Sequence, residues 1–209
     1  MHSEKILGKV VDIPICFAPT GYTRLMHHVG EPAVANVASN KNLIYALSTM
    51  GTTSPEELAA AVPNSRRWFQ LYIMKKREDS LAVIKQAKDS GFEALILTVD
   101  TPVNGLRYRD NRNGLTVPPK IRINTVFAIA RKPIWWLNLF TTGKLEFAAF
   151  RGWDKSLSEL AGLIYDPATT MKEITWLRSV WNGPIIIKGI QSVEDAKAVA
   201  KLGVQAIVL

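Results

Sequence analysis

The sequence predicts an α/β fold whose parallel strands form a (β/α)8 TIM barrel, truncated after about six strands. Short apolar runs recur along the chain, and segments with helical periodicity alternate with them. The apolar runs are nearly continuous, which is typical of strands buried on both faces of a parallel sheet. The six runs are Pro14–Pro19, Leu43–Thr49, Trp68–Ile73, Ala94–Asp100, Pro184–Gly189 and Ala206–Leu209.

The spacing of these runs favours a barrel over an open doubly wound sheet. The first four begin at positions 14, 43, 68 and 94, with separations of 29, 25 and 26 residues. A gap of 90 residues precedes the fifth run, and the sixth begins 22 residues later. The G-x-G-x-x-G turn of a dinucleotide-binding sheet does not follow the first run. Because a complete barrel needs about 250 residues, we expect this chain to be a piece of a larger protein.

The ends of several helices can be recognised between the strands. Ser54 is followed by Pro55 and, three residues on, by Glu57, which is the pattern of a capping box with proline in the first turn. An N-cap is expected at Ser80, a second capping box at Thr170 with Glu173, and another helix start at Ser192 with Asp195. Strands that alternate with such helices form βαβ units with right-handed crossovers.

Composition places the chain among reduced, cytoplasmic globular proteins. Its 209 residues are 47% apolar and carry a net charge of +8, which is enough apolar material for one core. The single cysteine excludes a disulfide scaffold, and no apolar run is long enough to span a bilayer. We expect residues 1–209 to form one partial barrel domain, with a lid or surface excursion over residues 101–170.

Polar side chains stand at the carboxyl end of every complete strand, where a barrel builds its active site. A hydroxyl there can simply cap the following helix, and that interpretation stays open for each serine or threonine. It does not explain Gln70, Asp100 or Lys188, because such groups are costly to bury beside apolar runs without partners. The full set is Thr20-Gly21, Ser48-Thr49, Gln70, Tyr72, Thr98, Asp100 and Lys188.

This set of groups suits a planar heterocyclic ligand. Hydroxyls and an amide at fixed positions can bind the edge of a flat ring, and Lys188 could stabilise negative charge that develops on it. Arg107, in a glycine-containing loop after the fourth strand, could bind a carboxylate in bidentate fashion. Asp100, in a site that contains Lys188, would stay ionised and could orient a histidine base.

Several motifs occur in the order and spacing of one known family. They are APTG at Ala18–Gly21, LST at Leu47–Thr49, FQLY at Phe69–Tyr72, LTVDTPVNGLRYRD at Leu97–Asp110 and IKGI around Lys188. Through them, essentially the whole chain resembles the FMN-dependent 2-hydroxy acid dehydrogenases, such as glycolate oxidase, L-lactate dehydrogenase and mandelate dehydrogenase. The motifs STMGTTS (Ser48–Ser54) and RNGLTVPP (Arg112–Pro119) make it most similar to bacterial L-lactate dehydrogenases.

The resemblance implies an FMN-linked oxidoreductase barrel and assigns roles to these residues. The backbone at Pro19, Thr20 and Gly21 would approach the reactive edge of the flavin. Lys188 would stabilise the reduced ring, Tyr72 and Arg107 would hold the substrate, and Asp100 would partner a catalytic histidine. The side chains that would bind the edge of the isoalloxazine ring are Ser48, Gln70 and Thr98.

The chain departs from the family pattern in what it lacks. The histidine base of the family follows the sixth strand in a motif like SNHGGRQLD, and this sequence stops at Leu209. The residues that hold the ribityl phosphate and an N-terminal substrate tyrosine are also absent. We therefore assign no base and no metal ligand in this chain, and expect this piece to be inactive alone.

The reaction implied for the full-length protein is oxidation of an L-2-hydroxy acid, above all L-lactate, to the 2-oxo acid. Two alternatives stay open: another FMN barrel such as a flavin-dependent isomerase, and a truncated barrel that only binds partners. The sequence does not select among quinone, cytochrome and oxygen as electron acceptor. A homo-oligomer is expected from the resemblance.

The segment from Lys120 to Lys155 is basic and aromatic. It contains seven basic residues against Glu146 and Asp154, together with Trp135 and Trp136. One interpretation is a lid that packs its apolar side on the barrel. The other is a peripheral membrane contact through residues 131–144 on the inner membrane face, because tryptophan and basic residues favour an anionic bilayer surface. No nucleic-acid recognition motif is present, so we expect no nucleic-acid partner.

Overall fold

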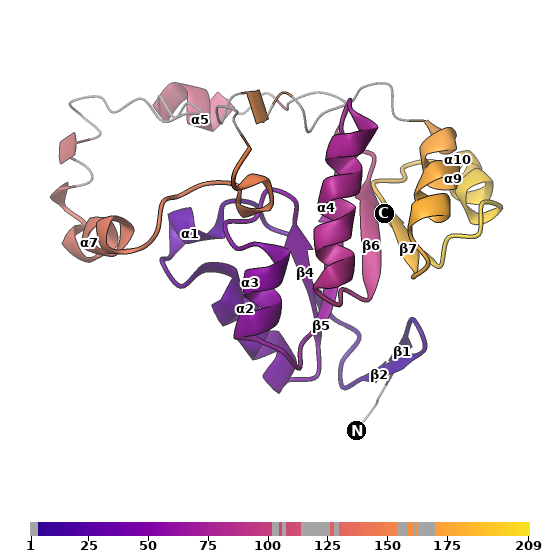
Figure 1. The fold of residues 1–209 in the computed structure, drawn as a ribbon, viewed down its shortest axis with the longest axis horizontal. Coiled ribbons are helices and arrows are strands. Elements are labelled where there is room, and N and C mark those ends of the chain that lie inside the picture. The colour runs from indigo at the N-terminus through magenta and orange to yellow at the C-terminus, as the bar shows by residue number, and fades with distance from the viewer. Residues whose placement is uncertain are drawn as a thin grey trace.

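A parallel six-stranded sheet forms the centre of the computed structural model, which describes residues 4–101, 105, 108–113, 126–127, 130–153, 159–160, 162 and 170–209 (Figure 1). The strands lie side by side in chain order, each parallel to its predecessor, as in an incomplete barrel. All six predicted strands are therefore confirmed. They are β3 (Cys16–Phe17), β4 (Ile44–Ser48), β5 (Arg66–Leu71), β6 (Ala94–Thr98), β7 (Ile185–Lys188) and β8 (Ala206–Val208).

Helices connect consecutive strands, as βαβ units require. In Figure 1, α3 and α4 lie in front of β4, β5 and β6. The connecting helices are α1 (Thr23–Met26), α2 (Gly30–Asn40), α3 (Pro55–Ala61), α4 (Arg77–Asp89), α9 (Met171–Val180) and α10 (Val193–Ala200). The long connection between β6 and β7 contains α5 (Tyr108–Asn113), α7 (Pro133–Thr141) and the short 3-10 helix η1 (Ala148–Phe150).

The two faces of the sheet bury different sets of side chains, because successive residues of a strand point to opposite faces. The helix-side face carries the larger core, which includes Leu47, Phe69, Leu97 and Ile187. The opposite face, here called the inner face, carries a smaller cluster, Val11, Ile44, Ala46, Trp68, Ala94, Ile96 and Ile186. The inner face is the side that would line the interior of a barrel.

An antiparallel hairpin that the sequence did not predict covers one end of this inner cluster. It consists of β1 (Glu4–Ile6) and β2 (Lys9–Val11), and Val11 is fully buried against the cluster. Leu7 and Gly8 form its turn with positive φ angles, the backbone conformation that tight hairpin turns require. Lys9 pairs with Glu93 at 2.6 Å. The hairpin therefore closes the amino ends of the strands and leaves the carboxyl ends for a site.

The helix caps follow the sequence at three of four positions. Ser54 and Glu57 form the predicted capping box, and Ser192 accepts from the Asp195 N–H. Thr170 is the N-cap and accepts from the Lys172 N–H. The capping box predicted with Glu173 is wrong, because the Glu173 carboxylate pairs with Arg77 instead.

The prediction that Ser80 caps its helix is wrong. The helix α4 begins at Arg77, with Lys76 at the N-cap, so Ser80 lies within the helix. Its hydroxyl accepts a hydrogen bond from the Met74 N–H at 2.9 Å and is fully buried. The serine therefore fixes the turn between β5 and α4 from a position four residues after the N-cap.

Candidate functional site

A row of buried polar side chains crosses the inner face at the carboxyl ends of three neighbouring strands. Ser48, Gln70 and Thr98 come from β4, β5 and β6 and are each less than a tenth exposed. Ser48 Oγ donates to Gln70 Oε1 at 3.1 Å, and Gln70 Nε2 donates to Thr98 Oγ1 at 3.0 Å. The structure thus brings together the three side chains that the sequence assigned to a ring edge, and their mutual hydrogen bonds offset the cost of burial.

A second set of hydrogen bonds fixes the strand ends that carry this row. Thr49 Oγ1 donates to the Gln70 carbonyl at 2.5 Å and accepts from the Tyr72 N–H at 3.4 Å. Ser48 Oγ also accepts from the Met50 N–H at 3.1 Å. The ends of β4 and β5 are therefore held together by both side-chain and backbone groups, so the amide of Gln70 has a defined orientation.

The row continues into an ion pair on the next strand. Lys188 is the register partner of Thr98, and its ammonium donates to Asp100 Oδ2 at 3.1 Å. The two side chains are 34% and 25% exposed, so both remain accessible to a ligand. Asp100 and Lys188 are thus in direct contact, and the role of this pair in a shared site stays a prediction. The predicted partner of Asp100, a histidine base, is not identified in this chain.

Gly189 makes the position of Asp100 possible. Its φ is 101°, a conformation that residues with a Cβ rarely adopt. A Cβ at this position would lie 2.5 Å from Asp100 Cβ and 2.6 Å from its Cγ. The glycine of the KG pair therefore gives the aspartate side chain the space in which it lies against the end of β7.

The segment after β3 approaches the segment after β4. The Tyr22 N–H donates to the Met50 carbonyl at 3.0 Å, and a Cβ at Gly21 would lie 3.1 Å from Met50 Cβ. Thr20 donates to the Ala18 carbonyl at 3.4 Å. Pro19, Thr20 and Gly21 thus run past the end of β4, and Gly21 permits the close approach of Met50.

Of the two residues predicted to bind substrate, the structure describes Tyr72 but not Arg107. Tyr72 directly follows β5, is half-buried, and packs against the larger core. Arg107 lies outside the described residues, as does much of the predicted lid over 101–170. Of that segment, α7 contacts α1 through a hydrogen bond from the Trp135 indole to the Leu25 carbonyl at 2.9 Å. The roles of Tyr72 and Arg107 in substrate binding remain predictions.

The sequence reasoning missed Glu31, a buried carboxylate in the first turn of α2. Glu31 is fully buried and accepts hydrogen bonds from the Thr52 N–H at 2.6 Å, from the Thr52 hydroxyl, and from the Thr53 hydroxyl at 2.8 Å. Thr52 Oγ1 in turn accepts from the Arg24 N–H at 3.1 Å. Glu31 thus ties the loop after β4, which carries Met50, to the helices after β3. The TTS sequence, a run of hydroxyl residues after a strand, was the available signal.

The thiol of Cys16 lies beside the inner cluster and is partly buried. Burial raises the pKa of Cys16 to about 11, although nearby Arg66 acts in the opposite direction. The thiol is therefore protonated at neutral pH, and it is the thiolate that attacks and binds metals. Among the described residues, no three His, Cys, Asp or Glu side chains come together as metal ligands would.

Comparison with known proteins identifies the family. A family model described as FMN-dependent dehydrogenase matches residues 2–209. The chain belongs to the FMN-dependent dehydrogenase family. Relatives include a protein of Mycobacterium tuberculosis named "Putative L-lactate dehydrogenase", 41% identical over 98% of this chain and 49% of its own length. An L-lactate dehydrogenase of Vibrio parahaemolyticus is 35% identical over 98% of this chain and 55% of its own.

Solved structures of the family share this fold. A monotopic membrane protein, (S)-mandelate dehydrogenase, matches 99% of this chain and 56% of its own with a TM-score of 0.93 and 29% identity. A mutant mandelate oxidase with (S)-mandelic acid gives a TM-score of 0.75 at 30% identity, over 98% and 50% of the two chains. The truncated barrel is thus confirmed. The chain spans about half the length of the curated relatives it matches.

The observed groups fit the FMN of this family. The Gln70 amide has a second N–H beyond the one it gives to Thr98, and Thr98 keeps its own hydroxyl proton to donate. A cation, Lys188, stands at the end of the same row. Donors and acceptors that are buried, aligned and fixed in orientation suit the polar edge of a flat ring, and Lys188 suits a ring that becomes negative on reduction.

Proposed function

We propose that the full-length protein uses FMN to oxidise an L-2-hydroxy acid, with L-lactate as the substrate, to the 2-oxo acid. The observation that carries this proposal is the continuous row from Ser48 through Gln70 and Thr98 to the Lys188–Asp100 ion pair. The membership in the family and the names of the relatives support it. FMN, when bound, accepts two electrons from the substrate carbon.

With FMN bound, different residues of this chain have different roles. Ser48, Gln70 and Thr98 bind and orient the ring edge, and the backbone at Pro19, Thr20 and Gly21 bounds its reactive side. Lys188 compensates negative charge on the ring.

Asp100, held by its ion pair with Lys188, orients the histidine base that the family resemblance implies. Tyr72 and Arg107 hold the substrate hydroxyl and carboxylate, with Arg107 suited to a bidentate contact.

Anaerobic reduction of the flavin tests the proposal. We expect L-lactate to bleach the visible flavin absorbance of the purified full-length protein, and the Thr98→Val variant to bind FMN more weakly. A flavin-dependent isomerase would keep its colour under the same conditions. Flavin that stays oxidised with L-lactate and with other L-2-hydroxy acids would overturn the proposed reaction.

We also propose a peripheral membrane contact through residues 131–144. The helix α7 contains no charged residue, and its Ile134 and Phe140 side chains are 76% and 78% exposed. Leu137 is exposed between them, and Lys132 and Lys144 flank the helix. An exposed apolar ridge between basic residues favours the surface of an anionic bilayer. The match to a monotopic mandelate dehydrogenase supports this proposal. None of the helices in the described part of the chain is long and apolar enough to span a bilayer.

Vesicle co-sedimentation tests the contact. The ridge variant Ile134→Ser/Phe140→Ser is preferable to changes at Trp135, because the Trp135 indole fastens α7 to the Leu25 carbonyl. We expect the ridge variant to lose most of its binding to vesicles. A matched control, Val37→Ser/Val193→Ser, removes two exposed apolar side chains from α2 and α10. Equal binding of the two double variants would overturn the contact.

A further inference from the structure

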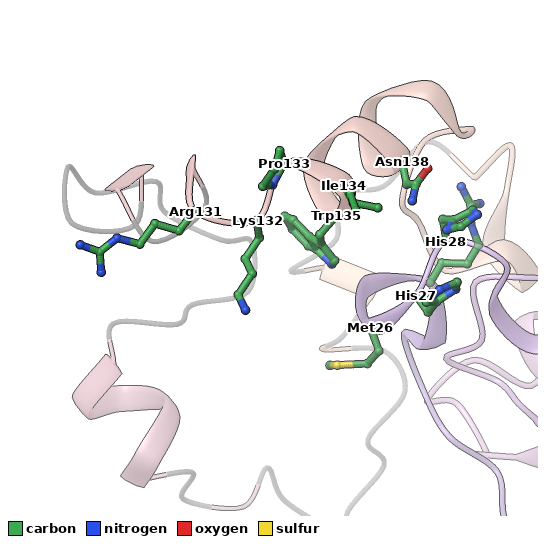
Figure 2. A pocket seen from close by; sticks show the side chains of 10 residues that line it. Met26, His27, His28, Arg131, Lys132, Pro133, Ile134, Trp135 and Asn138 are labelled. Carbon is green, nitrogen blue, oxygen red and sulfur yellow. The ribbon is translucent and has the colours of Figure 1, made fainter.

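A cavity of about 380 Å³ lies between α1 and α7, away from the strand ends (Figure 2). Its volume falls in the range of small-ligand sites. The residue pair His27-His28, which follows α1, lines one side. Lys132 and Trp135, at the start of α7, line another. Among the described residues that line it, none belongs to the flavin row, and Tyr72 is not one of them.

Basic side chains line a cavity whose surface is otherwise mostly apolar. Arg24, His27 and His28 come from the segment after β3, and Arg131 and Lys132 come from the long connection. None of the described residues that line it is acidic. Figure 2 shows that the Arg131 side chain is directed away from the two histidines, so we leave it out of the binding set. Arg24 and Lys132 are the cationic side chains that remain, and an anion between two cations lowers their mutual repulsion.

The imidazoles are arranged as a pair of donors. Their ring centroids are 4.6 Å apart and the rings are stacked with an interplanar angle of 29°. Each imidazole can donate at least one N–H, even when neutral. Stacked rings present their ring edges together, so His27 and His28 can donate to the same group of oxygens.

The two walls are fastened to each other. The Trp135 indole donates to the Leu25 carbonyl at 2.9 Å, and Arg24 Nη2 donates to the Gly143 carbonyl at 2.5 Å. These bonds hold both ends of the α7 segment against α1. The cavity is therefore defined by specific polar contacts between segments that are more than 100 residues apart in sequence.

The acidic side chains of the neighbouring cavity already form ion pairs with an arginine. Arg24 and His28 also line a neighbouring polar cavity that contains Glu57 and Glu146. Both carboxylates pair with Arg151, at 2.5 Å and 2.7 Å. The positive groups of the first cavity are thus not the counter-ions of these glutamates.

The location of the cavity beside the apolar ridge indicates the kind of ligand. Ile134 lines the cavity and is also the first residue of the exposed ridge that continues to Phe140. We propose that this cavity binds the phosphate of an anionic phospholipid headgroup, while the ridge contacts the acyl region. The proposal rests on the membrane contact proposed above and adds a specific headgroup site to it.

The test compares vesicles of phosphatidylcholine with vesicles that also contain phosphatidylglycerol, using the full-length protein. We expect the anionic lipid to strengthen binding, and Lys132→Gln and His27→Gln each to remove about fivefold of that gain. Lys144→Gln is the matched control, because it removes the same charge from the same segment but lines only the neighbouring cavity. We expect its effect to be smaller than that of Lys132→Gln.

Each outcome separates the headgroup site from the membrane contact. If the ridge variant binds both vesicles as well as the unmodified protein does, the membrane contact itself fails. If binding depends on the ridge but Lys144→Gln and Lys132→Gln lower it equally, a diffuse surface charge acts and the headgroup site is overturned. If inorganic phosphate raises the thermal stability through Lys132 while anionic vesicles add nothing, the site takes a soluble phosphate compound, which also overturns the lipid proposal.

Discussion

The strand-end row and the α7 segment use polar groups in opposite ways. In the row, Ser48, Gln70 and Thr98 are nearly fully buried, and each is hydrogen-bonded to its neighbour across adjacent strands. In the α7 segment, single bonds such as Trp135 to Leu25 hold a helix whose apolar residues remain exposed. Positioning for chemistry requires rigid elements, whereas a surface contact tolerates a peripheral segment attached at a few points. The proposed chemical site and the proposed contact surface therefore lie in different parts of the chain.

Replacing Lys188 is expected to have the largest effect, because it removes the only cation described in the row. We expect Lys188→Met to lower kcat for L-lactate roughly 100- to 1000-fold, as the loss of a preorganised charge stabiliser does. Steady-state kinetics of the full-length protein measure it, with Lys197→Met on α10 as the control. An unchanged kcat would show that the row does not act on the reacting ring.

Neutralising Glu31 tests whether the loop after β4 depends on a buried carboxylate. Gln cannot accept from all three donors, so Glu31→Gln leaves at least one buried N–H or O–H without a partner. We expect a loss of about 2 kcal/mol in the free energy of unfolding, together with a raised KM, because displacement of this loop takes the Met50 N–H away from Ser48 Oγ in the proposed flavin row. Urea unfolding and kinetics measure the two effects. Glu56→Gln, at an exposed position on α3, should change neither, and equal effects of both variants would remove the positioning role.

The hairpin at the other end of the barrel supplies a smaller, pH-dependent effect. Burial alone would raise the pKa of Glu93, but hydrogen bonds from Lys9 and Arg66 outweigh it and lower the pKa. The folded state therefore gains stability above the ordinary pKa of the glutamate, and loses it as pH falls through the lowered value. We expect less than about 1 kcal/mol, because Lys9 is exposed. Unfolding from pH 6 to pH 3 should show that Glu93→Gln flattens this dependence, and an unchanged slope would contradict it.

The smallest effect is expected on the exposed ridge. Ile134→Ser should change the free energy of unfolding by less than about 0.5 kcal/mol, since exposed substitutions remove little packing. Thermal unfolding, compared with the buried change Ile186→Ser on the inner face, measures the contrast. A large loss at Ile134 would mean that the ridge packs on the barrel as a lid, which was the other interpretation of this segment.

The apolar runs predicted the strands correctly because buried parallel strands leave a strong local signal. The polar residues at the strand ends could also be predicted. Gln70, Asp100 and Lys188 lie beside long apolar runs, where burying a charge or an amide is costly unless the group has a partner. The contacts between these side chains could not be predicted, because the hydrogen bond from Gln70 to Thr98 depends on how β5 and β6 are aligned in the folded sheet.

Three features were not predicted from the sequence, because their partners are distant along the chain or their sequence patterns are weak. The strands of the hairpin have only three residues each, too short for a periodic pattern. A glutamate in the first turn of a helix is ordinary, so nothing in the sequence around Glu31 indicates its bonds to Thr52. Ser80 carries a cap residue type, but the helix begins earlier because the serine bonds back to Met74.

Binding of FMN tests the central claim most directly. Titrating the flavin-free full-length protein with FMN should show one bound FMN per chain, and the double variant Gln70→Leu/Thr98→Val should bind at least about tenfold more weakly, as the loss of one or two buried hydrogen bonds implies. If the unmodified protein takes up no FMN, or if the double variant binds it equally well, the buried row at the strand ends is not the flavin site.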